Sequence, residues 1–272
     1  MPRLSEEMAD IAYAPGAGLS DTRLGGRPAL RVRPASGSAS CTVLHLHGGG
    51  YRTGDPAASG GLASYLAAGC DAENLLPAYR LAPEHPFPAA ADDALAAYTE
   101  LLERGVAPER LAVLGASAGG GLAAAMLLRA RAAGLPRPAA VVLLSPWLDL
   151  TNSADSYVRC AASDPLLSRE ILASAAADYL AGADPRTPTA SPLFAGDAAL
   201  AWMPPLLVQA SRDEVLADDA SRFADRVNRA GGDCTLQTWA GIAHCWQFGV
   251  PLLPEAVEAV DAVTDFLRAR LA

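Results

Sequence analysis

The sequence is that of a globular protein with an acidic surface. It has 272 residues, 51% of them hydrophobic, and a chain of this length buries roughly three quarters of its unfolded surface. The formal net charge of -9 argues against a nucleic acid or an anionic membrane as partner. All 21 basic residues are arginine, which excludes a Schiff-base lysine and a phosphate-binding P-loop. We therefore expect a small neutral or apolar substrate.

The cysteines and the N-terminus bear on location and cofactors. The cysteines are odd in number and scattered without a C-x-x-C pair, at Cys41, Cys70, Cys160, Cys234 and Cys245. We expect reduced thiols, with neither a disulfide framework nor a zinc site, and no cofactor. Acidic residues occupy the N-terminus where a secretory signal needs an apolar stretch, and no uncharged apolar run reaches membrane-spanning length. A cytoplasmic location follows as an expectation.

Apolar runs of strand composition alternate with Ala-rich helical patterns along the chain. Strands are predicted at residues 29–32, 41–46, 73–78, 111–115, 140–145, 205–211 and 234–239. Helices are predicted at residues 61–68, 89–104, 122–133, 218–230 and 255–269, several of them followed by glycine. This alternation predicts the α/β class, with a mostly parallel sheet covered by helices on both faces.

The alternation is interrupted between residues 151 and 203. A polar loop, one helix near residues 168–180 and a Pro-rich stretch replace a simple crossover there. Ligands of open α/β sheets bind beyond the carboxyl ends of the strands, where such an insertion can form a roof. We predict a single domain over residues 1–272, with a small helical cap made of residues 1–25 and 151–203.

Ser117 is the candidate nucleophile. It lies in the turn Gly-Ala-Ser-Ala-Gly at 115–119, after a predicted strand and before an Ala-rich helix, which is the context that the G-x-S-x-G elbow requires. The glycines suit a strained turn that passes close to neighbouring backbone. A glycine-rich strand-to-helix turn without catalytic role is the alternative, since short motifs also arise by accident.

A second glycine motif precedes the nucleophile in the chain. Residues 47–51, His-Gly-Gly-Gly-Tyr, follow the strand at 41–46 directly. Successive glycines expose backbone N–H groups that can stabilise a developing oxyanion, so Gly49, Gly50 and Ala118 are the predicted donors. A phosphate-binding loop is the competing interpretation, but neither a lysine nor a second glycine fingerprint accompanies it.

The base is identified by elimination among the four histidines. His45 and His47 precede the nucleophile, within a strand and at the start of the glycine motif, and His85 lies in a turn-like Pro-rich segment. His244 follows the last predicted strand and precedes the final helix, which satisfies the chain order Ser, acid, His of α/β-hydrolases. A histidine that is merely hydrogen-bonded in a loop is the alternative.

The acid is expected on the loop after the strand at 205–211. Asp213 and Glu214 are adjacent there, and either carboxylate could hold the imidazole tautomer and stabilise the imidazolium. Asp218 and Asp219 are more typical of the acidic first turn of the following helix. The residue types alone do not decide whether Asp213 or Glu214 is the acid.

The motifs together resemble the hormone-sensitive-lipase-like family of α/β-hydrolases, in the branch of bacterial carboxylesterases, ε-lactone hydrolases and acetyl-hydrolases. The resemblance covers most of the chain and rests on residues 47–51, 79–88, 115–120, 145–150 and 164–167 and on the His244 loop. It implies a serine esterase that acts through an acyl-serine intermediate, without cofactor, and often a homodimer. Set against the family's acid motif without gaps, Glu214 takes the acid position. The family commonly has Asp where this chain has Ala116, so a hydrogen bond found in relatives must be absent or replaced.

The predicted function is hydrolysis of small carboxylic esters or lactones. Tyr51, Trp147 and Trp246 are the predicted substrate-binding aromatics, although such side chains are more often core. An N-acyl or amide deacylase with the same triad is one alternative. A non-catalytic ligand-binding protein on this fold is another, but such proteins normally lack a triad member and none is missing here.

Overall fold

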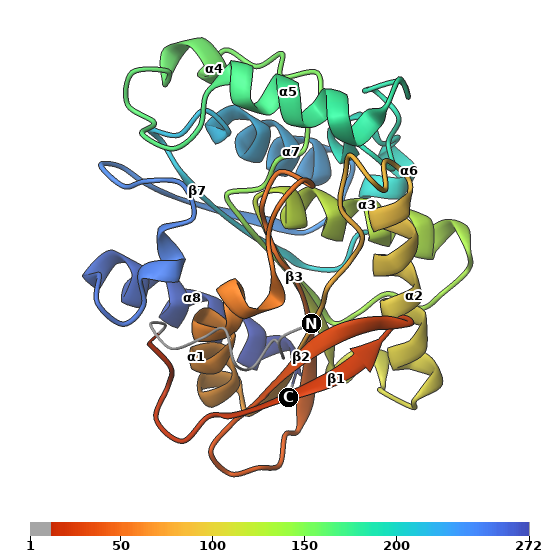
Figure 1. Cartoon of the computed structure of the whole chain (residues 1–272), viewed down its shortest axis with the longest axis vertical. Helices are drawn as coiled ribbons and strands as arrows, with labels where there is room; N and C mark the ends of the chain where they lie inside the picture. The colour runs from red at the N-terminus through yellow and green to blue at the C-terminus, as the bar shows by residue number, and fades with distance from the viewer. Residues whose placement is uncertain (1–11, 272) are drawn as a thin grey trace.

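The computed structural model describes residues 12–271, whose centre is an eight-stranded sheet (Figure 1). The spatial order of the strands is β1-β2-β4-β3-β5-β6-β7-β8. β1 and β2 pair in antiparallel fashion, β2 is antiparallel to β4, and the strands from β3 to β8 are parallel. Their bounds are Gly18–Leu24, Arg27–Arg33, Cys41–Leu46, Ala72–Pro77, Leu111–Ala116, Ala140–Leu144, Leu206–Ser211 and Cys234–Trp239. The predicted α/β class with a mostly parallel sheet is confirmed.

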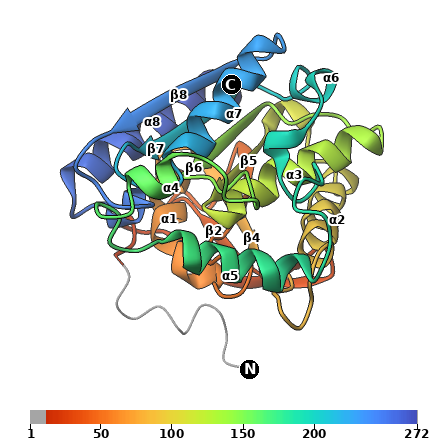
Figure 2. The same cartoon turned by 90° about the horizontal axis from the view of Figure 1, so that it is seen from above.

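Helices cover both faces of this sheet (Figure 2). One hydrophobic cluster joins α1 and α8 to one face, and another joins α2, α3 and α7 to the opposite face. The α-helices α1 to α8 are Gly60–Cys70, Ala89–Glu103, Ala118–Ala132, Ser156–Arg159, Arg169–Leu180, Asp197–Leu200, Ala217–Arg229 and Pro254–Leu271. Short 3-10 helices η1 to η4 occupy Pro56–Ser59, Pro108–Arg110, Pro192–Phe194 and Trp246–Gly249. Because both faces are covered, every residue of β3, β5, β6 and β7 is buried.

The predicted N-terminal cap segment contains a strand that the sequence did not predict. Gly18–Leu24 form β1, an edge strand that pairs with β2 through a turn at Gly25 and Gly26, whose φ angles are +60° and +72°. Two glycines with positive φ are typical of tight hairpins. The strand was not predicted because most of its side chains are not buried, so its apolar pattern is weak. Residues 1–11 of the predicted cap lie outside the described residues.

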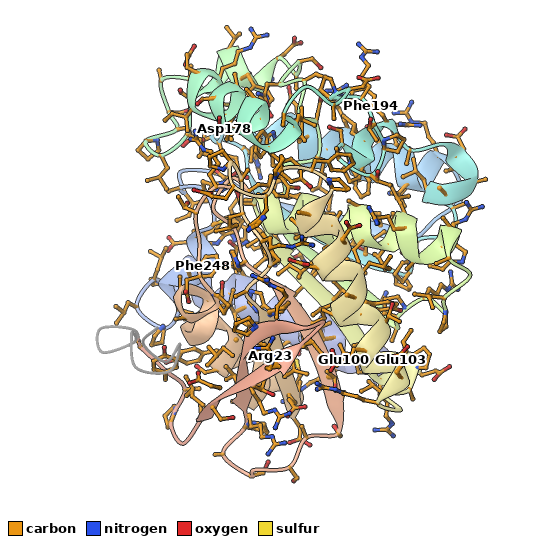
Figure 3. The ribbon with its side chains drawn as sticks, turned by 45° about the vertical axis from the view of Figure 1, so that its right-hand side comes forward. Arg23, Glu100, Glu103, Asp178, Phe194 and Phe248 are labelled. Atoms are coloured by element: carbon orange, nitrogen blue, oxygen red, sulfur yellow. The ribbon has the colours of Figure 1, made fainter. Side chains whose placement is uncertain are left out.

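The inserted segment contains α4, α5, η3 and α6. The predicted helix near 168–180 is α5, which begins where the Ser168 hydroxyl accepts a hydrogen bond from the Ile171 N–H. Asp178 of α5 and Phe194 of η3 lie at one end of the molecule, whereas Arg23 of β1 and Glu100 of α2 lie at the other (Figure 3). The insertion therefore stands at the end of the sheet opposite to the β1–β2 hairpin.

Candidate active site

Ser117 lies in a strained turn between β5 and α3. Its φ of 54° and ψ of -122° fall in a region that non-glycine residues rarely adopt. The turn is held by two backbone hydrogen bonds, from the Ser117 N–H to the Leu144 carbonyl (2.8 Å) and from the Trp147 N–H to the Ser117 carbonyl (3.0 Å). A Cβ on Gly119 would lie 2.2 Å from the Leu46 carbonyl oxygen, so only glycine fits there. The structure thus has the strand, turn and helix that the motif predicted.

The glycine motif after β3 forms a tight loop beside Ser117. Gly49 has a φ of +113°, and a Cβ on it would lie 2.0 Å from the Thr53 carbonyl oxygen. His47 anchors the loop to Tyr79, because its ring stacks on the Tyr79 ring and its carbonyl accepts a hydrogen bond from the Tyr79 hydroxyl (2.7 Å). Gly49 and Gly50 line the same pocket as Ser117, and Ala118 is the first residue of α3. That the N–H groups of Gly49, Gly50 and Ala118 stabilise the oxyanion remains a prediction.

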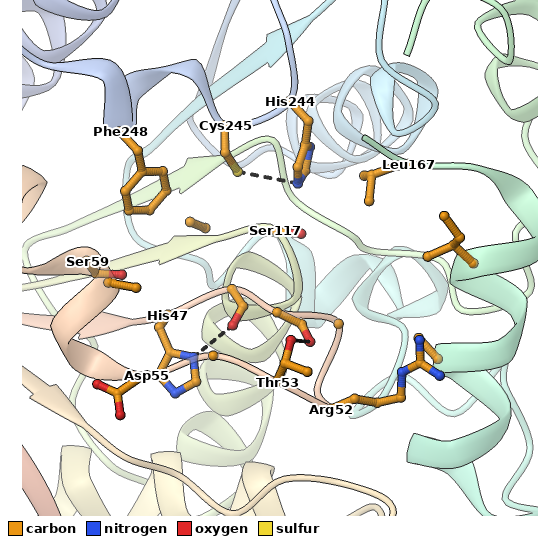
Figure 4. Close-up of a pocket in the computed structure, with 18 of the residues that line it drawn as sticks. His47, Arg52, Thr53, Asp55, Ser59, Ser117, Leu167, His244, Cys245 and Phe248 are labelled. Carbon is orange, nitrogen blue, oxygen red and sulfur yellow. Dashed lines mark hydrogen bonds between the residues drawn. The ribbon is translucent and has the colours of Figure 1, made fainter. Parts of the chain in front are cut away.

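Of the two candidate carboxylates, only Glu214 contacts His244. The His244 Nδ1 lies 2.5 Å from Glu214 Oε2, while Glu214 Oε1 accepts from the Ser211 N–H at 2.9 Å. Asp213 points elsewhere, because its Oδ2 accepts from the Gly241 N–H. Ser117 and His244 both line the pocket that Figure 4 shows. The structure brings the predicted nucleophile, base and acid together.

The remaining histidines are unsuited to act as the base. Burial lowers the pKa of His45 to about 3. Burial also lowers the pKa of His47 to about 4, although the Gly48 carbonyl and Asp55 act in the opposite direction. His85 is exposed and lines a separate hollow behind the glycine loop. For His244, burial alone would lower the pKa, but the adjacent Cys245 and then Glu214 raise it well above 6.5. His244 therefore favours the proton more strongly than an ordinary imidazole.

Cys245 is a site residue that the sequence analysis did not single out. Its Sγ lies 3.4 Å from His244 Nε2, and the thiol lines the pocket (Figure 4). The residue has a φ of 55°, and its N–H donates to the Ser145 hydroxyl at 3.2 Å. The sequence feature that could have identified Cys245 is its position directly after the candidate base, His244.

Comparison with known proteins identifies the family. A family model described as the alpha/beta hydrolase fold matches residues 43–248. An acetyl-hydrolase of Streptomyces hygroscopicus is 42% identical over 266 residues, covering 98% of this chain and 87% of the relative. The crystal structure of an esterase from the bacterial hormone-sensitive lipase family has a TM-score of 0.93 and 39% sequence identity, covering 99% of this chain and 90% of that chain. The chain belongs to the hormone-sensitive-lipase-like family of α/β-hydrolases.

A more distant relative agrees with this assignment. A putative acetyl-hydrolase, LipR, of Mycobacterium tuberculosis is 34% identical over 261 residues, covering 96% of this chain and 83% of the relative. The family and the fold class predicted from the sequence are thus both confirmed.

The pocket of this hormone-sensitive-lipase-like protein has a volume of about 520 Å³. The glycine loop with Arg52, Thr53 and Asp55 forms one wall, and the insertion forms the other. The side chains that the insertion contributes are apolar: Leu167, Ile171, Leu172 and Ala175. Phe248 of η4 completes the apolar lining. A pocket of this size and character suits a small ligand with an apolar group.

The predicted substrate-binding aromatics are wrong, because Tyr51, Trp147 and Trp246 are buried and none of them lines this pocket. Tyr51 stacks on Tyr179 with ring centroids 3.8 Å apart. The indole N–H groups of Trp147 and Trp246 donate to Asn152 Oδ1 (3.0 Å) and to the Glu255 carbonyl (3.1 Å). Their polar atoms are therefore satisfied inside the protein, as expected of core aromatics.

Two further observations concern metals and membranes. Within residues 12–271, no group of three or more His, Cys, Asp or Glu side chains is arranged to hold a metal ion, and all five cysteines have free thiols. No helix in this part of the chain is both long and apolar enough to cross a membrane.

Proposed function

We propose that this chain is a serine carboxylesterase that hydrolyses small carboxylic esters or lactones through an acyl-serine intermediate. The relatives named esterase and acetyl-hydrolase support the activity of a carboxylester hydrolase. The observation that carries the mechanism is the contact between His244 and the buried Glu214, made beside Ser117 at its strained turn. This is the arrangement of an activated serine nucleophile.

In the proposed acylation, His244 Nε2 takes the Ser117 hydroxyl proton as Oγ attacks the carbonyl carbon. The N–H groups of Gly49, Gly50 and Ala118 stabilise the oxyanion of the tetrahedral intermediate. The imidazolium, stabilised by Glu214, then gives its proton to the leaving alkoxide as the carbon–oxygen bond breaks. Water, deprotonated by the same base, then attacks the acyl-serine. This step releases the carboxylic acid product and restores the Ser117 hydroxyl.

The substrate is proposed to be small and uncharged near the scissile bond. The pocket wall formed by Leu167, Ile171 and Leu172 is apolar, and the Arg52 guanidinium opposite is already paired with Asp178 at 3.0 Å. One solved structure, that of EstE5, is 40% identical to this chain and was soaked with p-nitrophenyl butyrate. A short acyl chain fits these observations.

The test is a panel of p-nitrophenyl esters, lactones and matched anilides with the wild type and Ser117→Ala. Removal of the nucleophile is expected to lower kcat by several orders of magnitude, on the order of 10⁴ to 10⁶. Full turnover by Ser117→Ala would contradict the proposal. Faster turnover of the anilides than of the esters would favour the deacylase, and binding without turnover would favour a ligand-binding protein. We further propose a cytoplasmic location and a homodimer.

A further inference from the structure

The insertion and the loop that carries Glu214 are joined by side chains that bond to backbone. The Ser156 hydroxyl donates to the Val215 carbonyl at 2.6 Å, and the Ser163 hydroxyl donates to the Asp213 carbonyl at 2.9 Å. Residues 156–163 of the insertion thus reach the residues on both sides of Glu214. A loop is otherwise weakly restrained, so these contacts define where the acid lies.

Asp164 connects this junction to the pocket wall. It is 8% exposed, and its carboxylate accepts three backbone hydrogen bonds. Oδ2 accepts from the N–H of Val215, the neighbour of Glu214, at 2.9 Å. Oδ1 accepts from the N–H groups of Leu166 (3.0 Å) and Leu167 (2.9 Å), and Leu167 lines the pocket.

We propose that Asp164 is a positioning residue with two separable tasks: Oδ2 sets the loop of the triad acid, and Oδ1 sets the Leu167 wall that contacts the substrate's apolar group. The proposal rests on the proposed function, since it assigns Glu214 as the acid. A displacement of the acid by about 1 Å can cost roughly a hundredfold in rate.

The chemistry of the two oxygens makes these tasks separable by substitution. In Asp164→Asn, the amide oxygen can still accept from Leu166 and Leu167, because two N–H donors there favour the acceptor atom. The amide NH₂ then faces the Val215 N–H, and two donors cannot bond to each other. Asp164→Asn should therefore disturb the acid loop alone, whereas Asp164→Ala removes the support of both loop and wall.

The experiment measures kcat, KM and the pH dependence of kcat/KM on p-nitrophenyl acetate, butyrate and octanoate. We expect Asp164→Asn to lower kcat by roughly ten- to a hundredfold on every ester without changing the chain-length preference. Glu214 and Cys245 are the titratable groups that contact His244. Because Glu214 is displaced in this variant, the charged imidazole loses a stabilising partner, and the acid limb of the pH profile should move to lower pH. Asp164→Ala should show the same loss together with a changed chain-length preference through KM.

Asp93→Asn is the control, because it also alters a buried carboxylate that accepts from a backbone N–H, that of Arg80, although this carboxylate is ion-paired with the Arg80 side chain as well. It should lower the melting temperature but leave the acid limb and the chain-length preference in place. The proposal would be overturned if folded Asp164→Asn had the kcat and the acid limb of the wild type. Asp164→Asn tests the proposal even if Asp164→Ala does not fold. A failure of the proposed function is distinguishable, because it would appear as activity retained in Ser117→Ala.

Discussion

The two halves of the active site are built in different ways. The nucleophile half, with Ser117 and the glycine loop, is positioned by backbone: β3 and β5 are paired in the sheet, and a Cβ on Gly119 would collide with the Leu46 carbonyl. The acid–base half, with Glu214 and His244, lies on loops held by side chains such as Ser163 and Asp164. The first half depends on the absence of side chains at a few positions, whereas the second depends on specific polar atoms.

The largest effect expected in the acid–base half comes from Glu214→Gln. The amide can still fill the space beside His244, but it cannot stabilise the imidazolium that forms during acylation. By analogy with triads that lose their carboxylate, kcat should fall roughly 10³- to 10⁴-fold. Steady-state kinetics on p-nitrophenyl butyrate measures the loss.

Asp213→Asn is the control for that variant, because the Asp213 carboxylate accepts from the Gly241 N–H and does not contact His244. We expect its kcat to fall far less. If Asp213→Asn were the inactive variant and Glu214→Gln the active one, the assignment of the acid would be wrong.

In the nucleophile half, Gly119→Ala should act through stability. Its Cβ would lie 2.2 and 2.3 Å from the carbonyl oxygens of Leu46 and His47, and backbone of β3 and its loop cannot yield easily. The free energy of unfolding should drop by about 3 kcal/mol or more. Denaturant unfolding checks this against Gly196→Ala, where a Cβ meets nothing within 4 Å and φ is -71°. Equal stability of the two variants would refute the steric account of the turn.

The same contrast explains what could be predicted from the sequence. The turn at Ser117 and the glycine loop were recognisable because a strained backbone restricts residue types locally. Asp213 and Glu214 could not be separated by residue type, since only the folded loop directs one toward His244 and the other toward Gly241. Tyr51, Trp147 and Trp246 were misassigned because a position near the site in the sequence does not decide whether an aromatic side chain enters the pocket or the core.

A smaller effect concerns pH and Cys245. The His244 imidazole must be neutral to take the Ser117 proton, so kcat/KM should rise with pH through the pKa of His244. Burial lowers that pKa, but Cys245 and Glu214 raise it well above 6.5. Replacing the thiol by Cys245→Ala should therefore lower the pKa and move the acid limb of kcat/KM to lower pH.

Cys70→Ala removes a buried thiol that contacts the Thr264 carbonyl instead, so its acid limb should stay with the wild type. An acid limb that moves to higher pH in Cys245→Ala, or that moves equally in both variants, would show that Cys245 does not favour the charged imidazole.

The central claim is that Ser117, activated by His244 and Glu214, forms the covalent intermediate. Its most direct test is intact-protein and peptide mass spectrometry after reaction with diethyl p-nitrophenyl phosphate, which phosphorylates an activated serine and releases nitrophenolate. The account predicts one diethylphosphoryl group per chain, located on Ser117, with loss of esterase activity in proportion to labelling and no labelling of Ser117→Ala. Labelling of Cys245 or another residue in parallel with inactivation, with Ser117 unmodified, would contradict it.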